Sequence, residues 1–521
     1  MQKISTVAQH FLYKSRSFDI TTSFARHPIF GDQIWFRVFI SLLLLNITAY
    51  FLFVSQHPIY NHGFRFPWIE ARHGVHHGRW FNLVLRNITN SADIYAFVPL
   101  FAILMNVVAG FMSMKVWGLK QKPFETFIII GLITTYPAFL SFYYFSWTTI
   151  LFMSGTFFAV LALSICRRFK ILDITLGGIV VMIMMASYQP SISVYTTVAV
   201  GSAIAALIAR NDIPIVDMMR TLFARVIASA IGLGAYKISV IFMGIKKYTI
   251  ATVTLEDVPE RVLKVIEVSI RQLTVTQPEL MTPLKTALLV LFIMAVIISL
   301  ICVRKSLVKV GLVLGLWFGL VVATKSMYLL SPDTQFFLYR YNTSLAFFHA
   351  FTAAVIIYGS RLSSVRSLAI LFTGFLLFRF VQVDLIRQEV LLRGQQHDLA
   401  FANRLLVRME SLPDIDFKKK YDLIRVGNFP DYRGTIFRSK GHRWEEKGDL
   451  HMDDARITSA SADENVFILL GSKIQFQNTG SDGKFREKML DARRNLLKDR
   501  KPWPHDSSIF VSNDKLIIYL Q

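Results

Sequence analysis

Eleven apolar segments recur along this chain, and they constrain its fold more than any other feature. Each is near the roughly 17–25 residues that an α-helix needs to cross the hydrocarbon core of a bilayer. They cover residues 34–53, 94–112, 125–141, 148–166, 172–187, 194–209, 222–244, 286–302, 308–323, 345–358 and 368–383. Hydrophobic residues make up 53% of the 521 residues and charged residues only 18%, which is too apolar for a soluble enzyme. The sequence therefore predicts a polytopic α-helical membrane protein with about eleven spans in residues 34–384.

Basic residues lie between the apolar segments in a pattern that predicts orientation. If eleven spans are correct, one side of the membrane receives all of the basic clusters, at residues 3–26, 115–122, 167–170, 210–220, 304–309 and 361–366. Cytoplasmic loops carry the excess of Lys and Arg, so we expect a cytoplasmic N-terminal segment (1–33) and an outside C-terminus. The formal net charge of +22 is then an orientation signal rather than the basic face of a nucleic-acid-binding fold.

The long polar segments all fall on the predicted outer side. They are the loops 56–93, 245–285 and 326–344 and the tail 385–521. Apolar residues between Val258 and Leu273 recur at helical spacing, which predicts an amphipathic helix lying on the outer membrane surface or packing on the tail. The tail is helical in pattern to Glu410 and then contains short strand-like runs at 465–470, 508–511 and 515–520. These runs predict a small α+β domain.

The first outer loop, from Phe64 to Trp80, concentrates arginines and histidines around one acid. Titratable groups gathered at a helix end favour a site over a connector. The chain has no phosphate-cradling Gly-rich loop, paired-Cys motif, His-Glu-x-x-His or Gly-x-Ser-x-Gly, so ATP-driven transport and zinc hydrolysis are not expected. His73, His76 and His77 could bind a metal, but phosphate contact or solvation is the more common role for such a group. We predict no metal site.

Four motifs in sequence order carry a family resemblance. They are the acid-containing loop that ends in Gly78-Arg79-Trp80 and is followed by Asp93, then Tyr136-Pro137-Ala138-Phe139, Ser187-Tyr188-Gln189-Pro190-Ser191-Ile192 and Trp503-Pro504-His505-Asp506-Ser507-Ser508-Ile509. Together they resemble the serotype-converting, phage-type O-antigen glucosyltransferases, polytopic enzymes of the GT-C class. Many members have paired acids in the first loop, whereas this chain has the single Glu70 between Ile69 and Ala71.

The resemblance implies a reaction and a location. Such an enzyme takes a hexose, here glucose, from a polyprenyl-phosphate carrier and attaches it with inversion to lipid-linked O-antigen on the outer, periplasmic face of the bacterial cytoplasmic membrane. It implies a functional link to a donor-making glycosyltransferase and a donor flippase, contact with membrane lipid, no further cofactor and no nucleic acid. A lipid-linked oligosaccharide flippase or other transporter, an O-antigen polymerase, and an aminosugar or mannosyl transferase of the same class are the alternatives.

The reaction needs a carboxylate to accept a proton and cations to hold phosphate. Glu70 suits the base, although it could instead pair with a neighbouring arginine. Asp93 is either a second acid or the cap of the next helix. Phosphate binding is expected of Arg72, Arg79, Arg340 and Lys237.

Arginines grip phosphate oxygens bidentately, and Arg340 could alternatively be an interface anchor. Lys237 lies about 10 Å from its helix end at 1.5 Å per residue, which is within snorkelling reach. Lys325, nearer the outer end of its segment, is interpreted as an anchor. Contacts to sugar or acceptor are expected of His76, His77, Tyr188 and Gln189.

Overall fold

The computed structural model describes residues 34–56, 75–88, 97–119, 122–143, 148–167, 169–209, 214–245, 257–274, 282–329, 341–427, 429, 463–477 and 482–520. These form two compact units. Unit 1 runs to Leu385, apart from Ser55 and Gln56, and unit 2 runs from Ile386 onward. Helix α18 (Ser363–Glu410) is shared, because its first part belongs to unit 1 and its second part to unit 2.

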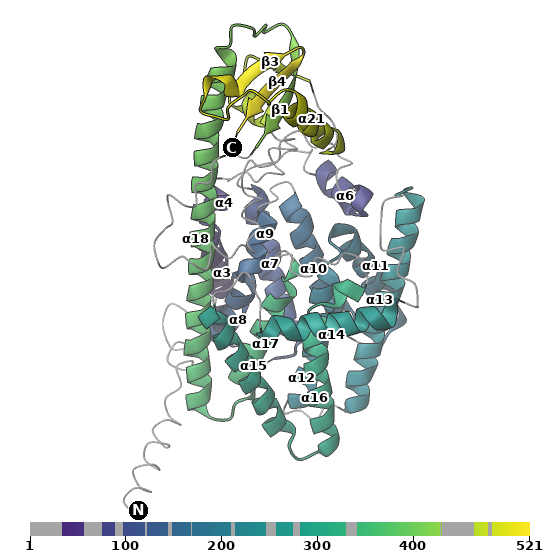
Figure 1. Ribbon diagram of the computed structural model, residues 1–521. Coiled ribbons are helices and arrows are strands. Elements are labelled where there is room, and N and C mark those ends of the chain that lie inside the picture. The colour runs from purple at the N-terminus through teal and green to yellow at the C-terminus, as the bar shows by residue number, and fades with distance from the viewer. Residues whose placement is uncertain are drawn as a thin grey trace, which may run out of the picture. The chain divides into compact units, whose positions relative to one another are not determined.

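Unit 1 is built from helices (Figure 1). Besides α18 they are α3 (Ile34–Ala49), α4 (Phe51–Ser55), η2 (Val75–His77), α6 (Phe81–Ile88), α7 (Phe97–Val116), α8 (Pro123–Thr134), η3 (Pro137–Phe139), α9 (Leu140–Tyr143), α10 (Thr149–Ile165), α11 (Ile171–Ser187), α12 (Ser191–Ile208), α13 (Ile215–Phe242), α14 (Val258–Thr274), α15 (Thr282–Val303), α16 (Leu307–Ala323), η6 (Ser326–Leu329) and α17 (Ser344–Gly359). Each of the eleven predicted apolar segments coincides with one of these helices or with a broken pair of them.

The number of membrane spans depends on which of these helices are long and apolar enough to cross a bilayer. Within the described ranges, five helices are long and apolar enough to cross a membrane, or six if the bent pair at residues 123–134 and 137–143 counts as one span. Five further apolar helices have 10–17 residues. The chain is thus a helical protein with several candidate spans, and the count of eleven stays a prediction.

Two glycines bring α11 and α13 close together. A Cβ on Gly232 would lie 2.5 Å from the Cβ of Val181 and 2.6 Å from the carbonyl oxygen of Gly178. A Cβ on Gly178 would lie 2.9 Å from the side chain of Ile231. Small residues allow such close approach of helix backbones within a membrane. The contact fixes α13 against α11, so the end of α11 is held beside the second half of α13.

The helix α8 breaks at Tyr136-Pro137 with a bend of 44°. A break of this kind frees backbone carbonyls that must be satisfied away from water. The hydroxyl of Tyr50 donates to the carbonyl oxygen of Thr134 at 2.7 Å, and the amide of Asn106 donates to the same oxygen at 3.3 Å. Polar side chains from α7 and from the end of α3 therefore stabilise the break.

The amphipathic helix predicted in the second loop is α14. Its buried residues Val265, Val268, Ser269 and Gln272 face the elements that α14 contacts, which are η6, α16 and α15. Figure 1 shows α14 running across α16 rather than along it. Other helices of unit 1 therefore cover these four side chains, whereas Val258, Val262 and Ile270 of the predicted apolar face are exposed.

Unit 2 combines the second part of α18 with a mixed sheet and short helices. The strands are β1 (Lys420–Val426), β2 (Gln475–Phe476), β3 (Ile509–Ser512) and β4 (Lys515–Tyr519), and the helices are α20 (Asp463–Leu469), α21 (Asp482–Asn495) and η10 (Asp506–Ser508). The strand order is β2-β1-β4-β3. Strand β1 pairs in parallel with β2 and β4, and β3 pairs antiparallel with β4.

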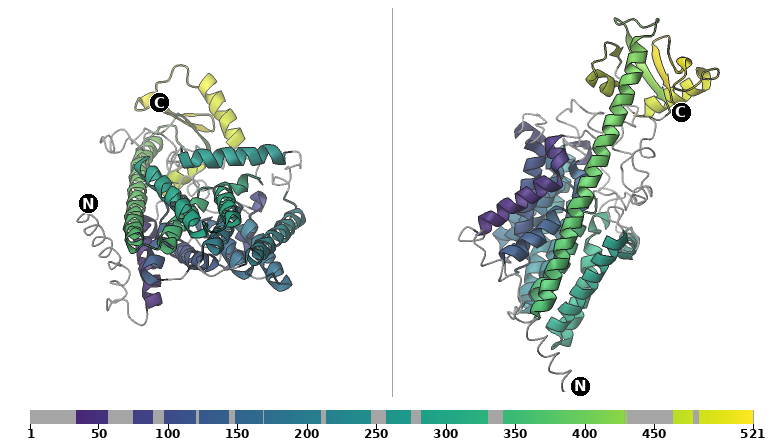
Figure 2. Two further views of the ribbon diagram at one scale, coloured as in Figure 1. Left: turned by 90° about the horizontal axis from the view of Figure 1, so that it is seen from below. Right: turned by 90° about the vertical axis from the view of Figure 1, so that its left-hand side faces the viewer.

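The core of unit 2 lies between α18 and the sheet, which Figure 2 shows side by side. Phe401, Leu405 and Met409 of α18 pack in one cluster with Leu423 of β1 and Leu516 of β4. The predicted helix to Glu410 and the predicted strand-like runs at 508–511 and 515–520 are confirmed.

The third run, 465–470, was predicted as a strand and that prediction is wrong, because these residues belong mainly to α20. A short apolar run does not distinguish a strand from a buried helix. Here two consecutive residues, Val466 and Phe467, enter the core while Ile468 and Leu469 are exposed. This grouping suits one face of a helix rather than strict alternation along a strand.

Candidate functional site

The first outer loop and the break between α11 and α12 meet in unit 1. After η2 the chain turns at Gly78, whose φ of +75° is in the left-handed region that favours glycine. The amide of Gly78 donates to the carbonyl of Val75 at 2.7 Å. Arg79 and Trp80 follow this turn and precede α6. The turn therefore presents Arg79 from a short, hydrogen-bonded segment.

Gln189 holds this segment from the helix break. Helix α11 ends at Ser187, Tyr188 is extended, and α12 begins after Pro190, which has no amide hydrogen to continue a helix. The Nε2 group of Gln189 donates to the carbonyl oxygen of His77 at 2.9 Å and to the hydroxyl of Tyr236 at 3.0 Å. Its Oε1 accepts from Nε of Arg79 at 3.4 Å. One carboxamide thus contacts the loop backbone, the arginine and α13.

Helix α13 supplies the other contacts with the loop. The hydroxyl of Tyr236 donates to the carbonyl oxygen of Gly78 at 3.2 Å. The indole of Trp80 donates to Oγ of Ser239 at 2.9 Å, and this hydroxyl donates to the backbone carbonyl of Tyr236 at 2.7 Å. Sequence reasoning did not select Tyr236 or Ser239. Their signal is weak, since a tyrosine and a serine three residues apart on an apolar helix are also common in helix packing.

The guanidinium of Arg79 is oriented by aromatic rings. Its central carbon lies 5.3 Å from the ring centroid of Phe152 and 5.6 Å from that of Tyr188. Those rings contact each other at 4.5 Å. Both distances are within the range of cation–π attraction. Among the residues that the structure describes, the two Nη groups of Arg79 donate to no acceptor, because its hydrogen bond uses Nε.

We define the Arg79 cluster as Arg79, Tyr188, Gln189, Tyr236 and Ser239. Arg79 is half-buried, whereas Tyr188 and Tyr236 are buried. Of these residues, Arg79, Tyr188 and Gln189 were selected from the sequence, and they come from positions 110 residues apart. The arrangement can hold an anion: Arg79 is a half-buried cation with a fixed plane, and among the described residues its Nη groups have no acceptor and the side chains in contact with it are neutral.

The remaining predicted site residues are either exposed or outside the described part of the chain. Lys237 is exposed on α13, although its neighbour Tyr236 is buried, and the phosphate-binding role predicted for Lys237 stays a prediction. The side chain of His77 is exposed, while its backbone carbonyl accepts from Gln189. Outside the described residues lie Glu70, Arg72, Asp93, Arg340 and the side chain of His76.

The described residues also show whether His, Cys, Asp and Glu side chains gather closely enough to bind a metal ion. Within the described part of the chain, no group of three or more His, Cys, Asp or Glu side chains could hold a metal ion. His73 and the side chain of His76 are outside that part. The roles predicted for these residues and the absence of a metal site therefore stay predictions.

A second polar group, which we call the Lys325 cluster, consists of Gln272, Lys325, Tyr328 and Asn342. The ammonium of Lys325 donates to Oδ1 of Asn342, and Nε2 of Gln272 donates to the same oxygen at 3.2 Å. Lys325 is only 1% exposed. Its interpretation as an interface anchor is wrong, because an anchor must reach the headgroup region. The sequence did not reveal this burial. Lys325 directly follows an apolar segment, and a lysine there is compatible with a position in the headgroup region or in the protein interior.

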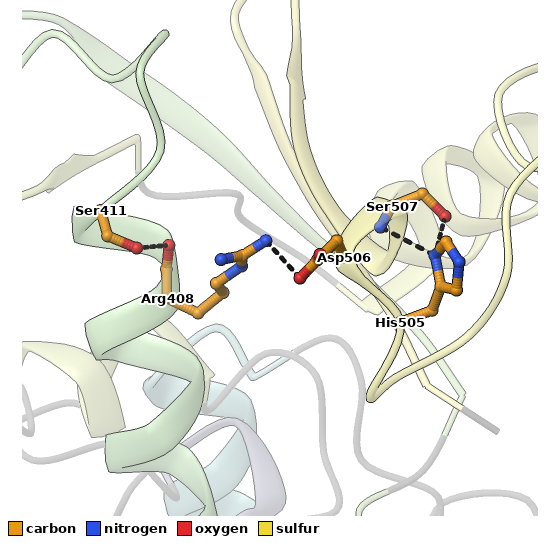
Figure 3. Close-up of polar contacts among 5 residues, drawn as sticks. All are labelled: Arg408, Ser411, His505, Asp506 and Ser507. Atoms are coloured by element: carbon orange, nitrogen blue, oxygen red, sulfur yellow. Dashed lines mark hydrogen bonds and ion pairs between the residues drawn. The ribbon is translucent and has the colours of Figure 1, made fainter.

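The fourth motif, at 503–509, lies in unit 2 (Figure 3). Nη2 of Arg408 on α18 lies 2.7 Å from Oδ1 of Asp506. The amide of Ser507 donates to Nδ1 of His505 at 3.1 Å. The amide of Trp503 donates to the carbonyl of Tyr519 on β4 at 2.9 Å. The motif therefore forms a turn that connects the sheet to α18, and its exposed ion pair contributes little stability.

Comparison with known proteins assigns a family. A family model described as Glucosyl transferase GtrII matches residues 66–378, which is more than half of the chain. The matched region includes every residue of the Arg79 and Lys325 clusters and almost none of unit 2. No curated protein and no solved structure matches the chain significantly.

Proposed function

Because the chain belongs to the glucosyl transferase GtrII family, we propose that it transfers glucose from a polyprenyl-phosphate carrier to lipid-linked O-antigen on the outer face of the bacterial cytoplasmic membrane. Membership confirms the resemblance drawn from the four motifs and makes the protein a glycosyltransferase. The carrier, the acceptor, the inverting course and the side of the membrane are the content of the proposal.

The geometry of Arg79 is the observation that supports this proposal most. Two aromatic rings and Gln189 fix the guanidinium plane, and both Nη groups are left for a ligand within the described structure. A guanidinium binds two phosphate oxygens in parallel. A phosphate-linked donor therefore suits Arg79 better than a neutral sugar would.

The proposed reaction is a direct displacement at the anomeric carbon. The acceptor hydroxyl loses its proton to the Glu70 carboxylate, and its oxygen forms the new bond to C1 of the hexose. The bond between C1 and the phosphate oxygen breaks, and its electron pair leaves with the phosphate. Arg79, with Arg72 and Arg340, binds the phosphate as that charge develops. Asp93 is the alternative base.

Gln189 has a different role in this proposal from the sugar contact predicted for it. Both of its N–H donors are directed at protein acceptors, the carbonyl of His77 and the hydroxyl of Tyr236. Gln189 is therefore a positioning residue for Arg79 and the loop. Tyr188 contributes its ring face to Arg79, and contact of His76 or His77 with the acceptor stays part of the proposal.

The location of the proposed reaction follows from the charge pattern of the sequence. An N-terminus in the cytoplasm and a C-terminus in the periplasm place the first loop and unit 2 on the outer side. The protein then depends on another glycosyltransferase that makes the donor and on a flippase that brings it across. An accessibility label at Gln521 should react from outside, and reaction from the cytoplasm would contradict this topology.

The decisive experiment measures transfer by the purified full-length protein in lipid nanodiscs. Radiolabelled polyprenyl-phosphate glucose and lipid-linked O-antigen oligosaccharide are the substrates. Transfer should be detected, should persist with a chelator, and should fall about 10²–10⁴-fold in Glu70→Gln, as expected for loss of a general base. The matched control is Glu260→Gln, which changes an exposed acid on α14.

Three results would contradict parts of the proposal. No transfer by abundant, folded protein would refute the donor or the acceptor. Near-normal transfer by Glu70→Gln would refute the base and favour Asp93, which Asp93→Asn then tests. An equal loss in Glu260→Gln would show that the effect at Glu70 is not specific.

A further inference from the structure

A strongly basic surface lies at the C-terminal end of α21 in unit 2. The segment from Arg493 to Lys501 contains five lysines and arginines and one acid, Asp499, which leaves a net charge of +4. All five basic side chains are exposed. We call them the α21 basic surface. They are Arg493, Arg494, Lys498, Arg500 and Lys501.

The charge of this surface is not neutralised by the described residues of unit 2. Within that part of the chain, none of the five side chains takes part in an ion pair. Other cations of the unit do so. Ion pairs with aspartates are formed by Arg408, Lys419, Lys488 and Lys515. A concentrated, unpaired positive charge attracts anionic partners.

The backbone that carries the surface is anchored to the core of unit 2. Leu497 is 6% exposed and packs in one cluster with Phe510 of β3. The guanidinium carbon of Arg500 lies 3.9 Å from the ring centroid of the same phenylalanine. The amide of Lys501 donates to Oγ of Ser507 at 3.2 Å. The charges are therefore held on an ordered segment, which loses less conformational entropy on binding than a flexible tail would.

Helix α21 forms an outer layer of unit 2. Leu423 of β1 packs in the cluster that contains α18, whereas Ile424 and Val426 pack with Ala492 of α21. Successive side chains of a strand point to opposite faces of the sheet. The two helices therefore cover opposite faces, as Figure 1 shows for α18 and α21. The basic surface is at the end of the outer layer that α21 forms.

The connection of unit 2 to unit 1 indicates which anion this surface meets. Helix α18 is a candidate membrane span, and it begins in unit 1 and ends in unit 2. A bilayer is therefore a permanent neighbour of the chain, and its headgroups are present at a high effective concentration. Basic segments close to a span are attracted to anionic phospholipids. A nucleic acid or an acidic protein would have to bind from solution without this advantage.

We propose that the α21 basic surface docks unit 2 on the anionic phospholipid headgroups of the bilayer. Phosphate oxygens of the lipids accept hydrogen bonds from the exposed guanidinium and ammonium groups. The contact is electrostatic, so salt should weaken it. The screening length falls from about 8 Å at physiological ionic strength to about 3 Å at 1 M. Docking of this kind does not depend on the donor or the acceptor of the proposed reaction.

Amide hydrogen exchange of the purified full-length protein tests the docking. The protein is placed in nanodiscs of phosphatidylcholine alone or of equal parts of phosphatidylcholine and phosphatidylglycerol, without substrates. With phosphatidylglycerol, the amides of residues 496–501 should exchange at least tenfold more slowly, because several cations contribute to the contact. Salt at about 1 M should remove this difference.

Two triple variants assign the effect to the α21 basic surface. The combined change Arg493→Gln, Arg494→Gln and Lys498→Gln should abolish the slowing by phosphatidylglycerol. The matched control replaces three exposed lysines elsewhere in unit 2 with glutamine and should keep the slowing. These lysines are Lys418, Lys420 and Lys473. Exchange in β4 should be as in the wild type in both variants, which shows that unit 2 is folded.

Four results would overturn the proposal. They are equal exchange in the two lipid compositions, slowing that survives high salt, slowing that persists in the α21 variant, and loss of slowing in the control variant. Addition of lipid-linked oligosaccharide to phosphatidylcholine nanodiscs tests the other anionic lipid of the reaction. Slowing that requires this addition would assign the surface to the acceptor and refute docking on phospholipid. Absence of glucose transfer would refute the proposed function and leave the exchange result intact.

Discussion

Replacing Gln189 with leucine tests how far the Arg79 cluster depends on one carboxamide. Leucine keeps a similar volume but removes the donors to His77 and Tyr236 and the acceptor for Arg79. Each of the two shorter hydrogen bonds contributes about 1 kcal/mol net, and the contact to Arg79 at 3.4 Å is weaker. Their loss therefore costs about 2 kcal/mol.

The effect on transfer follows from that energy. If the loss of about 2 kcal/mol displaces the loop and the Arg79 guanidinium, transition-state stabilisation falls by the same amount. At about 1.4 kcal/mol per tenfold, kcat/KM for the donor should then fall roughly 30-fold. The KM for the donor should rise, because phosphate binding is affected before chemistry. Initial rates across a range of donor concentrations measure both constants.

The variant Tyr236→Phe provides an internal check. It removes the hydroxyl that accepts from Gln189 and donates to the carbonyl of Gly78. Because both residues act on one loop, the double variant should lose less than the sum of the two single losses. Strict additivity would show that the two side chains act separately.

Unchanged kinetics in the Gln189 variant would contradict this role of the carboxamide. A donor kcat/KM within twofold of wild type in Gln189→Leu, at normal abundance and melting temperature, would show that Gln189 does not position Arg79. The control Gln396→Leu makes the same change at an exposed position of α18 and should be neutral. A similar loss in that control would show a general effect of the added apolar surface.

Three further outcomes are expected. Arg79→Lys should reduce kcat/KM for the donor at least tenfold, because an ammonium lacks the planar pair of donors, and wild-type kinetics would refute bidentate phosphate binding. Gly427→Ala should speed amide hydrogen exchange in β1 roughly a hundredfold. Gly427 has a φ of +99°, and a Cβ there would lie 2.3 Å from the backbone carbonyl oxygen of Leu520. Unchanged exchange would contradict this expectation. Hydrogen bonds from Asn495 and Lys515 lower the pKa of Asp491, so its stabilising contribution is complete above the unfolded pKa of about 3.9 and is lost as pH falls through the lower folded value. Exchange in β4 should therefore rise in acid less steeply in Asp491→Asn than in the wild type.

The helices of unit 1 were predictable because a membrane span is largely a property of local composition. About twenty consecutive apolar residues satisfy the hydrocarbon core whatever their neighbours are. The amphipathic helix α14 was predictable for a related reason, because its apolar positions recur at helical spacing. Which helices bury part of its apolar face depends on other segments, and the two locations considered from the sequence, the outer membrane surface and the tail, stay predictions.

Unit 2 shows where local pattern fails. The run from Asn465 to Leu470 has the composition of a strand, yet it is mainly helical because Val466 and Phe467 pack together into the core formed with α18. Strand β1 has only a weak local signal, since Lys420, Asp422 and Arg425 interrupt its apolar residues. Its position between β2 and β4 supplies the pairing that makes it a strand.

The sequence by itself determined that this chain is a polytopic membrane protein of a glucosyltransferase family, and it identified Arg79, Tyr188 and Gln189 as candidates. Composition and short motifs are local properties, and they can be identified without knowledge of the tertiary structure. Only the tertiary structure decided that these three residues meet, that Tyr236 joins them, and that Lys325 is buried. These contacts depend on which faces of the helices pack against each other. That packing is decided only when segments more than a hundred residues apart in the sequence come together.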